Sequence, residues 1–174
     1  MKKILDSIRK SLDSKNYHSA LVLSLIVPDI CGKLEDSNKS SSKRYPEWFN
    51  KYLGKKYDNW LSGNDCYALR CSFLHEGSGN TENQRRAKDV LDYIVFTPEG
   101  GHCQRLSHCR FGDKRYDGKE ILKLSTSRFC QDIIEATNKW LDDVKNNKII
   151  QGNIAEMLDI HEGGFSIGRA ILMN

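Results

Sequence analysis

Residues 65–80 read DCYALRCSFLHEGSGN, a short apolar run that ends in glycine and has an arginine in its middle. If this stretch is a helix, at about 100° per residue, apolar side chains lie within about 60° of Arg70 on both sides: Cys66, Phe73, Tyr67 and Leu74. Arg70 therefore lies inside an apolar stripe. A guanidinium keeps its charge, so Arg70 must pair with an acid, or its face must open onto a partner, a ligand or a cleft.

The same helix is predicted to run from about Gly63 to Glu76 and to end at Gly77. His75 lies in its last turn, about 140° round the helix from Arg70. The two side chains can therefore converge only where the helix ends or where a second copy of the chain faces it. Within one chain, Arg70 could instead pair with Asp29, the acid that interrupts the apolar segment IVPDIC.

The chain has the length and composition of one soluble globular domain. It has 174 residues, of which 39% are hydrophobic, and its mean hydropathy is -0.60. The segment MKKILDSIRK turns polar before any apolar run develops, which is not typical of a signal peptide. The longest apolar stretch, ALVLSLIV, is too short to cross a bilayer. We therefore expect a cytoplasmic protein that does not enter a membrane.

Cysteine content and charge narrow the class of protein further. Six cysteines in a chain without a secretion signal are expected to be reduced thiols, most of them small core residues. The net charge of +4 and the isoelectric point near 8.7 are mildly basic. Such a charge permits a nucleic-acid partner without requiring one.

Hydrophobic periodicity predicts further helices on both sides of residues 63–76. The N-terminal half has an amphipathic helix over 3–14, a nearly continuous apolar helix kinked or restarted at Pro28, and a helix that opens at Pro46 after a polar surface loop. A long helix after the capping segment STS places apolar residues at spacings of three and four: Phe129, Ile133, Ala136 and Trp140.

Between residues 90 and 124 the spacing of apolar residues no longer follows a helical period. Residues around 90–96, 103–111 and 119–124 favour strands and are separated by turn signals, which suggests a small β-meander inserted between helices. Residues 146–174 are expected to form a short helix at 152–158 and an irregular tail. The predicted fold is therefore mainly α, a helical bundle with a small inserted antiparallel β-meander.

The arginine, four intervening residues and histidine of RCSFLH resemble the motif of the HEPN superfamily, whose members are helical bundles and often metal-independent ribonucleases. The segments HSALVLSLIVPDICGKLE and YPEWFNKYL and the helix around Trp140 suit that bundle. The resemblance covers residues 1–145, with the meander inserted at about 90–124 and with 146–174 as a C-terminal extension. The chain differs from many members in having Cys71, where they have asparagine, aspartate or histidine, directly after the arginine.

The resemblance implies a homodimer in which two motifs form one composite cleft for RNA. Arg70 would hold the scissile phosphate and stabilise its charge in the transition state, and His75 would act as general acid or base. Asp29, Tyr67 and Glu76 would support them, with no metal and no other cofactor. A toxin or defence role, with an antitoxin or another protein partner, would fit many relatives. The alternatives are a non-catalytic HEPN-like module that binds RNA or protein, and a structural protein in which Asp29 holds Arg70.

A second set of residues is basic and is a candidate RNA-binding surface. Its arginines lie before and within the predicted meander, where Phe111 and Tyr116 are interleaved with them: Arg85, Arg86, Arg110 and Arg115. Such a set could follow a phosphate backbone while the aromatic rings stack on bases. The alternative is an ordinary solvated face, because acidic residues dilute the charge.

A third set has the chemistry of zinc ligands. The segment HCQRLSHC places His102, Cys103, His108 and Cys109 close together in the sequence. Adjacent residues on a strand point to opposite faces, so one strand cannot aim all four at one ion. We therefore predict no metal site here, with both cysteines as unliganded thiols.

Overall fold

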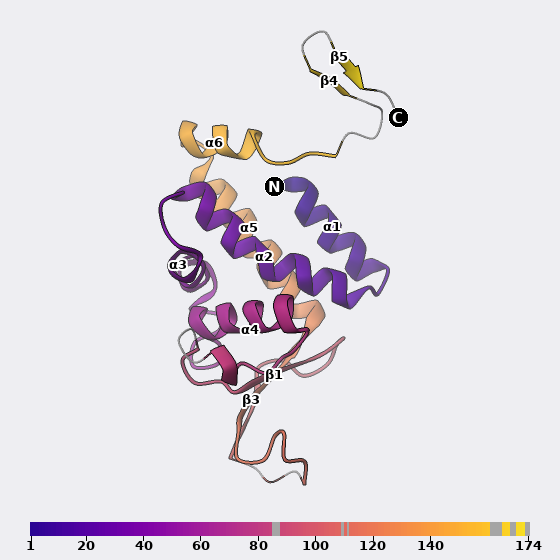
Figure 1. The fold of residues 1–174 in the computed structure, drawn as a ribbon, viewed down its shortest axis with the longest axis vertical. Helices are drawn as coiled ribbons and strands as arrows, with labels where there is room; N and C mark the ends of the chain where they lie inside the picture. The colour runs from indigo at the N-terminus through magenta and orange to yellow at the C-terminus, as the bar shows by residue number, and fades with distance from the viewer. Residues whose placement is uncertain (85–87, 109, 111, 161–164, 168–169, 173–174) are drawn as a thin grey trace.

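The computed structural model describes the chain except for residues 85–87, 109, 111, 161–164, 168–169 and 173–174 (Figure 1). The described part is mainly helical with a small sheet, as predicted. Its elements, in chain order, are α1 (Lys2–Asp13), α2 (Tyr17–Glu35), α3 (Ser41–Leu53), α4 (Gly63–Glu76), the 3₁₀-helix η1 (Glu82–Gln84), β1 (Tyr93–Thr97), β2 (Gln104–Ser107), β3 (Glu120–Ser125), α5 (Thr126–Val144), α6 (Lys148–Ala155), β4 (Phe165–Ile167) and β5 (Ala170–Leu172).

Helix α2 lies at the centre of the bundle and packs against α1, α3 and α5. Leu25, Val27 and Cys31 are fully buried in it, which explains its nearly continuous apolar sequence. The helix continues through Pro28 to Glu35 without a restart. The predicted central helix is confirmed. Figure 1 shows α4 lying across the long helices, between them and the sheet.

Helix α3 begins earlier than the sequence predicted. Its first residue is Ser41, so part of the expected surface loop is helical and Pro46 lies inside the helix. The physical reason is a tertiary contact: the Ser41 hydroxyl and the Arg44 guanidinium both donate hydrogen bonds to the Asp29 carboxylate of α2. These bonds stabilise a first turn that serine-rich composition alone does not favour.

The three-stranded sheet is mixed, and the predicted antiparallel meander is wrong in its order. Strand β3 lies between β1 and β2, parallel to β1 and antiparallel to β2. Parallel pairing aligns Ile94 with Leu122 and Phe96 with Leu124, which places apolar residues of both strands on one face. Three of the four β2 residues are exposed, which suits an edge strand.

Helix α5 agrees with its predicted start and core face. The Ser125 side chain accepts a hydrogen bond from the Arg128 backbone N–H, and all four predicted apolar residues are buried. The next helix, α6, begins at Lys148 rather than near 152, because the Asn147 side chain caps the N–H groups of Ile149 and Ile150. In the predicted irregular tail, β4 and β5 pair antiparallel.

Candidate functional site

Local capping signals fix both ends of α4, the helix that carries Arg70 and His75. At its start, the Ser62 side chain accepts a hydrogen bond from the Asp65 backbone N–H at 3.0 Å. At its end, Gly77 adopts a left-handed conformation with φ of 65°, and its N–H bonds the carbonyl of Phe73. The predicted bounds of this helix are confirmed. Arg70 therefore lies in the middle of α4 and His75 in its last turn.

Arg70 is half-buried and only partly satisfied. Its side chain is 20% exposed, and its Nη2 atom lies 3.5 Å from Asp29 Oδ2. Nη1 lies 4.0 Å from the Sγ atom of Cys71, which is a weak contact. The Nε atom is buried and has no hydrogen-bond partner among the described residues. The pair with Asp29, which the sequence offered as the alternative to a functional role for Arg70, is present, but it uses little of the donor capacity of the guanidinium.

Asp29 has closer partners than Arg70. The Arg44 Nε atom donates to Asp29 Oδ1 at 2.8 Å, and the Ser41 hydroxyl donates to the same oxygen at 2.7 Å. Arg44 also bonds the backbone carbonyl of Lys39 at 2.6 Å. One carboxylate thus faces two guanidinium groups, both on side chains that are mostly buried. We call Asp29, Arg44 and Arg70 the arginine cluster; it carries one positive charge in excess.

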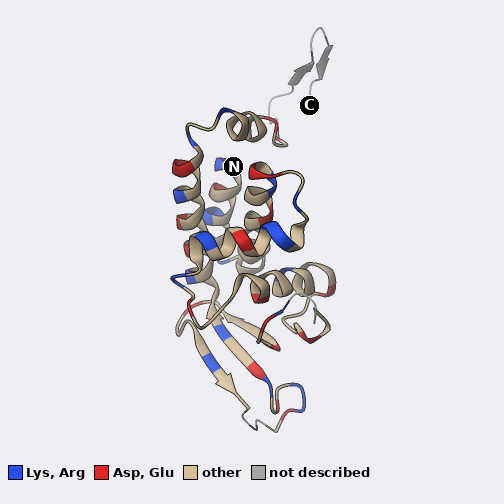
Figure 2. Ribbon diagram, turned by 90° about the vertical axis from the view of Figure 1, so that its left-hand side faces the viewer, with Lys and Arg blue, Asp and Glu red and all other residues tan. Residues whose placement is uncertain are grey.

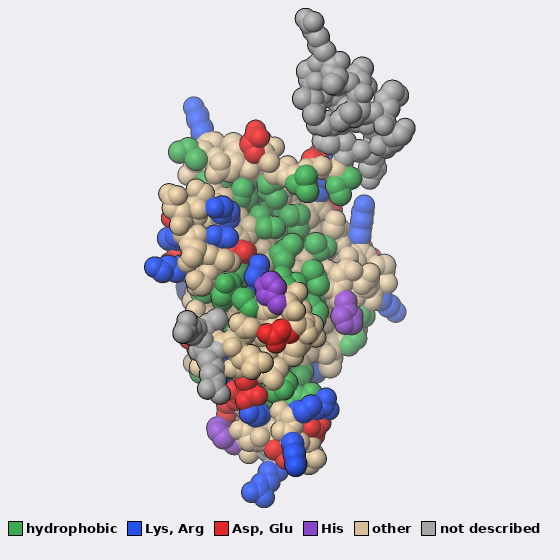
Figure 3. All heavy atoms as spheres, viewed as in Figure 1, with side chains coloured by type: hydrophobic (Ala, Val, Ile, Leu, Met, Phe, Trp, Pro, Cys, Tyr) green, Lys and Arg blue, Asp and Glu red, His purple; other side chains and the backbone are tan. Residues whose placement is uncertain are grey.

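Half-buried apolar side chains flank Asp29 on α2 and Arg70 on α4. These lie at helical spacing on α2 and α4: Val22, Ile26, Ile30, Tyr67 and Leu74. Figure 3 shows hydrophobic side chains gathered in a band over the face that α1, α2 and α4 form. Burial raises the pKa of the Tyr67 phenol, so its hydroxyl stays protonated and can donate a hydrogen bond at neutral pH. The surface around Arg70 is therefore apolar with one cationic centre.

His75 and Glu76 are separate from the arginine cluster. Both side chains are exposed at the end of α4, and Glu76 accepts a hydrogen bond from Gln84 Nε2 at 3.2 Å. Because α4 is regular, His75 points about 140° away from Arg70. The structure thus brings together Arg70, Asp29 and Tyr67, and leaves His75 facing outward.

Two arginines of the basic set are among the described residues, and one of them, Arg115, is paired within the chain. Arg115 binds both carboxylate oxygens of Asp113, and Lys119 pairs with Glu82. Arg110 is exposed, whereas Arg85, Arg86 and Phe111 lie outside the described residues. Figure 2 shows Lys and Arg interspersed with Asp and Glu along the helices and strands. The described cations therefore form no separate cationic face.

The four residues with zinc-ligand chemistry have other roles or lie outside the described part. His102 contacts Tyr57 and Ser125, whereas His108 pairs with Glu120 at 2.9 Å. Cys103 is a free thiol, and Cys109 is not among the described residues. Within the described part of the chain, no three His, Cys, Asp or Glu side chains come together as metal binding requires.

A buried polar network, which the sequence did not indicate, joins α5 to the loops around it. The Ser125 backbone N–H donates to His102 Nδ1 at 3.2 Å, so the ring is neutral and its Nε2–H donates to the Tyr57 hydroxyl at 3.1 Å. That hydroxyl donates to Asp132 Oδ2 at 2.8 Å, and Lys56 pairs with the same carboxylate. The network joins residues up to 76 positions apart in the sequence, so no local sequence pattern indicates it.

Comparison of the chain with models of protein families, with curated proteins and with solved structures finds no match. The resemblance to the HEPN superfamily therefore remains an expectation from the sequence. In the part of the chain that the structure describes, no helix has both the length and the apolar character needed to cross a membrane.

Proposed function

We propose that the protein is a metal-independent endoribonuclease of HEPN type, with Arg70 as phosphate-binding residue and His75 as general acid or base. The observation that supports this best is the excess positive charge of the arginine cluster. Arg44 alone is enough to neutralise Asp29, so Arg70 has guanidinium donors available for an anion. An RNA phosphate is the anion that such a planar donor group binds well.

The proposed active site combines two copies of the chain. Arg70 and His75 diverge on α4, so each Arg70 would work with a His75 brought close by a two-fold partner. The half-buried apolar side chains around Arg70 would form the contact between the copies, because their burial supplies the driving force for association. Asp29 and Tyr67 would then orient the guanidinium and the bound phosphate.

The proposed reaction needs one nucleophile from the RNA itself. The ribose 2′-oxygen attacks phosphorus and loses its proton to a base, the bond from phosphorus to the 5′-oxygen breaks, and that oxygen takes a proton from an acid. His75 serves one of these proton transfers and Arg70 stabilises the charge on the phosphoryl oxygens. The products are a 2′,3′-cyclic phosphate and a 5′-hydroxyl. A toxin or defence role in the cytoplasm, with an antitoxin as partner, belongs to the same proposal.

A second candidate is a HEPN-like module that binds RNA or a protein without cleaving it. The contact between Arg70 and Asp29 favours it, since a phosphate must compete with this carboxylate for the guanidinium. The exposed position of His75 is compatible with both candidates.

Incubation of the purified protein with mixed RNA in excess EDTA separates the two candidates. The wild type should cleave RNA and leave cyclic-phosphate ends. His75→Ala should lose about two or more orders of magnitude in rate, the usual contribution of a general acid or base, and should remain folded because the side chain is exposed. His108→Ala is the matched control, because this exposed histidine lies in the turn after β2.

Unchanged cleavage by folded His75→Ala would refute the proposed role of His75. Binding of RNA by the wild type without any cleavage would favour the second candidate. Circular dichroism of each variant checks that a loss of activity is not a loss of fold.

A further inference from the structure

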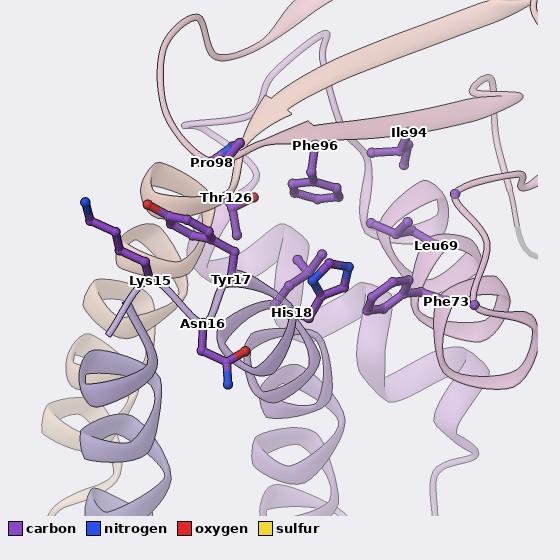
Figure 4. Close-up of a pocket in the computed structure, with 13 residues that line it drawn as sticks. Lys15, Asn16, Tyr17, His18, Leu69, Phe73, Ile94, Phe96, Pro98 and Thr126 are labelled. Carbon is purple, nitrogen blue, oxygen red and sulfur yellow. The ribbon is translucent and has the colours of Figure 1, made fainter. Parts of the chain in front are cut away.

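An elongated pocket of about 360 Å³ opens beside the turn between α1 and α2 (Figure 4). Its other walls come from the C-terminal half of α4, strand β1 and the start of α5. We call it the aromatic pocket, because Tyr17, Phe73 and Phe96 line it. Its volume lies within the usual range for sites that bind small molecules, about 300–1,000 Å³. It shares no lining residue with the arginine cluster or with His75, so it is a separate candidate site.

One end of the aromatic pocket is apolar. Figure 4 shows Leu69, Phe73 and Ile94 grouped at this end, and Leu69 and Ile94 are buried. Two polar groups at this end are already bonded within the chain: the Gly77 N–H donates to the Phe73 carbonyl at 3.0 Å, and the Gly79 carbonyl accepts from the Ile94 N–H at 2.9 Å. The part of a ligand that lies here should be apolar, because a polar group would lose its bonds to water without replacing them.

The backbone fixes this apolar end. A Cβ atom on Gly79 would lie 2.1 Å from the Ile94 carbonyl oxygen, so only glycine permits this close approach of the chain to β1. At the start of α5, the Thr126 hydroxyl donates to the Thr97 carbonyl at 3.1 Å, which ties that wall to the end of β1. The pocket is therefore formed before any ligand arrives.

The opposite end of the aromatic pocket favours an anion. Figure 4 shows Lys15 and the Tyr17 hydroxyl at that end, away from Leu69 and Ile94. Lys15 is exposed and makes no ion pair among the described residues, and no acidic residue is among those that line the pocket. The first N–H groups of α2, at Tyr17 and His18, have no hydrogen-bond partner within the described part of the chain. A lysine and the N-terminus of a helix both attract negative charge.

Lys15 has a backbone conformation that lysine does not favour. Its φ is 57°, in the left-handed region where glycine usually ends a helix such as α1. Glycine would therefore suit the fold better at this position. The residue that is present instead supplies a cation at the mouth of the aromatic pocket.

We propose that the aromatic pocket binds a medium-chain carboxylic acid, with the hydrocarbon tail at the apolar end and the carboxylate at Lys15. Lys15 is the one lysine or arginine among the described residues that line the pocket, which matches the single charge of a carboxylate. The tail needs no hydrogen bonds, so its burial among apolar side chains is favourable. A ligand with polar atoms along its whole length, such as a nucleoside or a sugar, would leave several of them unpaired at the apolar end. The proposal does not depend on RNA cleavage at Arg70.

The test is a titration of the full chain, followed by ¹H–¹⁵N NMR, with butanoate, hexanoate and octanoate, and with 1-octanol and adenosine 5′-monophosphate for comparison. Octanoate should shift the amide signals of Tyr17, Gly79 and Phe96 in a saturable way. The affinity should rise by roughly tenfold or more for each two CH₂ groups added, because each buried CH₂ contributes about fourfold. 1-Octanol has the same tail without the charge, so it should bind about two- to fivefold more weakly than octanoate.

Two variants separate the role of the charge from that of the apolar end. Lys15→Gly should weaken octanoate by about two- to fivefold and leave 1-octanol unchanged. It should not lower the melting temperature, because glycine adopts a φ of 57° without strain. Phe73→Ala should weaken both ligands equally, by roughly fivefold, which corresponds to about 40 Å² of apolar contact. Lys10→Ala, which removes the same charge from the last turn of α1 outside the pocket, should change neither ligand.

The absence of localised shifts with octanoate at millimolar concentration would overturn the proposal. Shifts produced by adenosine 5′-monophosphate but not by octanoate would also overturn it, and would assign the pocket to a nucleotide. Equal affinity for octanoate and 1-octanol would contradict the assigned role of Lys15. An affinity that does not rise from butanoate to octanoate would contradict the assigned position of the tail. Thermal melts of each variant check that weaker binding is not a loss of fold.

Discussion

The two arginines that face Asp29 should differ in their importance for folding. Arg44 donates to Asp29 at 2.8 Å and to the Lys39 carbonyl at 2.6 Å, whereas Arg70 has one contact of 3.5 Å with the carboxylate. Hydrogen bonds to charged groups are worth about 1.5–3 kcal/mol each, and a long, partly screened ion pair about 1 kcal/mol or less. The bond to the Lys39 carbonyl is exposed, so water largely replaces it when it is lost. We therefore expect Arg44→Met to cost about 2–3 kcal/mol, mostly from the bond to Asp29, and Arg70→Met about 1 kcal/mol or less.

Thermal unfolding followed by circular dichroism measures this difference. Methionine keeps most of the aliphatic stem, so the comparison isolates the guanidinium. For a chain of this size, 1 kcal/mol corresponds to about 2–4 °C. Arg44→Met should therefore lower the melting temperature by about 4–12 °C, and Arg70→Met by at most about 4 °C.

Equal destabilisation by the two variants would refute the argument. It would show that Arg70 holds the fold as firmly as Arg44 does, and that its donors are not available to a phosphate. A stable Arg70→Met variant that has lost RNA cleavage or RNA binding would support the proposed function, since the loss could not be attributed to unfolding.

Two further predictions concern association and pH. If the apolar surface around Arg70 joins two copies, Leu74→Glu should give a folded monomer by light scattering. Leu158→Glu, the same change at a 97% exposed position, should leave the dimer intact. A dimer that persists in Leu74→Glu contradicts this interface. Burial, with a smaller contribution from Arg128, lowers the pKa of His102 below its ordinary 6.5, against the opposing effect of Asp132. The unfolded state then binds more protons, so the His102 contribution to the free energy of unfolding is complete above about pH 6.5 and is lost as the pH falls through the folded-state pKa. Urea unfolding between about pH 5 and 7.5 should show this slope in the wild type and a shallower one in His102→Gln; equal slopes would rule out His102 as the cause.

Sequence alone predicted the parts of the fold whose signals are local. The limits of α4 follow from an apolar run and from Gly77, and the start of α5 follows from a serine cap. The pair of Arg70 and Asp29 was also predictable, because each charge interrupts an apolar segment that has to be buried. The helix limits are marked within a few residues of the feature. For the pair, each apolar segment marks its own charge, although the two charges lie 41 positions apart.

The features that sequence missed depend on contacts between distant segments. Arg44 lies in a serine-rich stretch that resembles a loop, and the bonds of Ser41 and Arg44 to Asp29, 12 and 15 positions away, stabilise that stretch as a helix. The position of β3 between β1 and β2 depends on which strands pair, and strand propensity carries no information on pairing. The aromatic pocket likewise joins residues from Lys15 to Thr126, so no motif marks it.

The arrangement of the arginine cluster also bears on how Arg70 could exchange one anion for another. If Arg70 were the sole partner of Asp29, a phosphate that took its guanidinium would leave a half-buried carboxylate without a counter-charge, at a cost of several kcal/mol. Arg44 and Ser41 hold that carboxylate at 2.8 and 2.7 Å, so it stays paired when Arg70 turns away. The competing contact that must be given up is the single one at 3.5 Å. A phosphate that accepts two short bonds from the guanidinium would therefore displace Asp29 from Arg70. Arg44 keeps the free-energy cost of this exchange low, because it remains paired with the carboxylate.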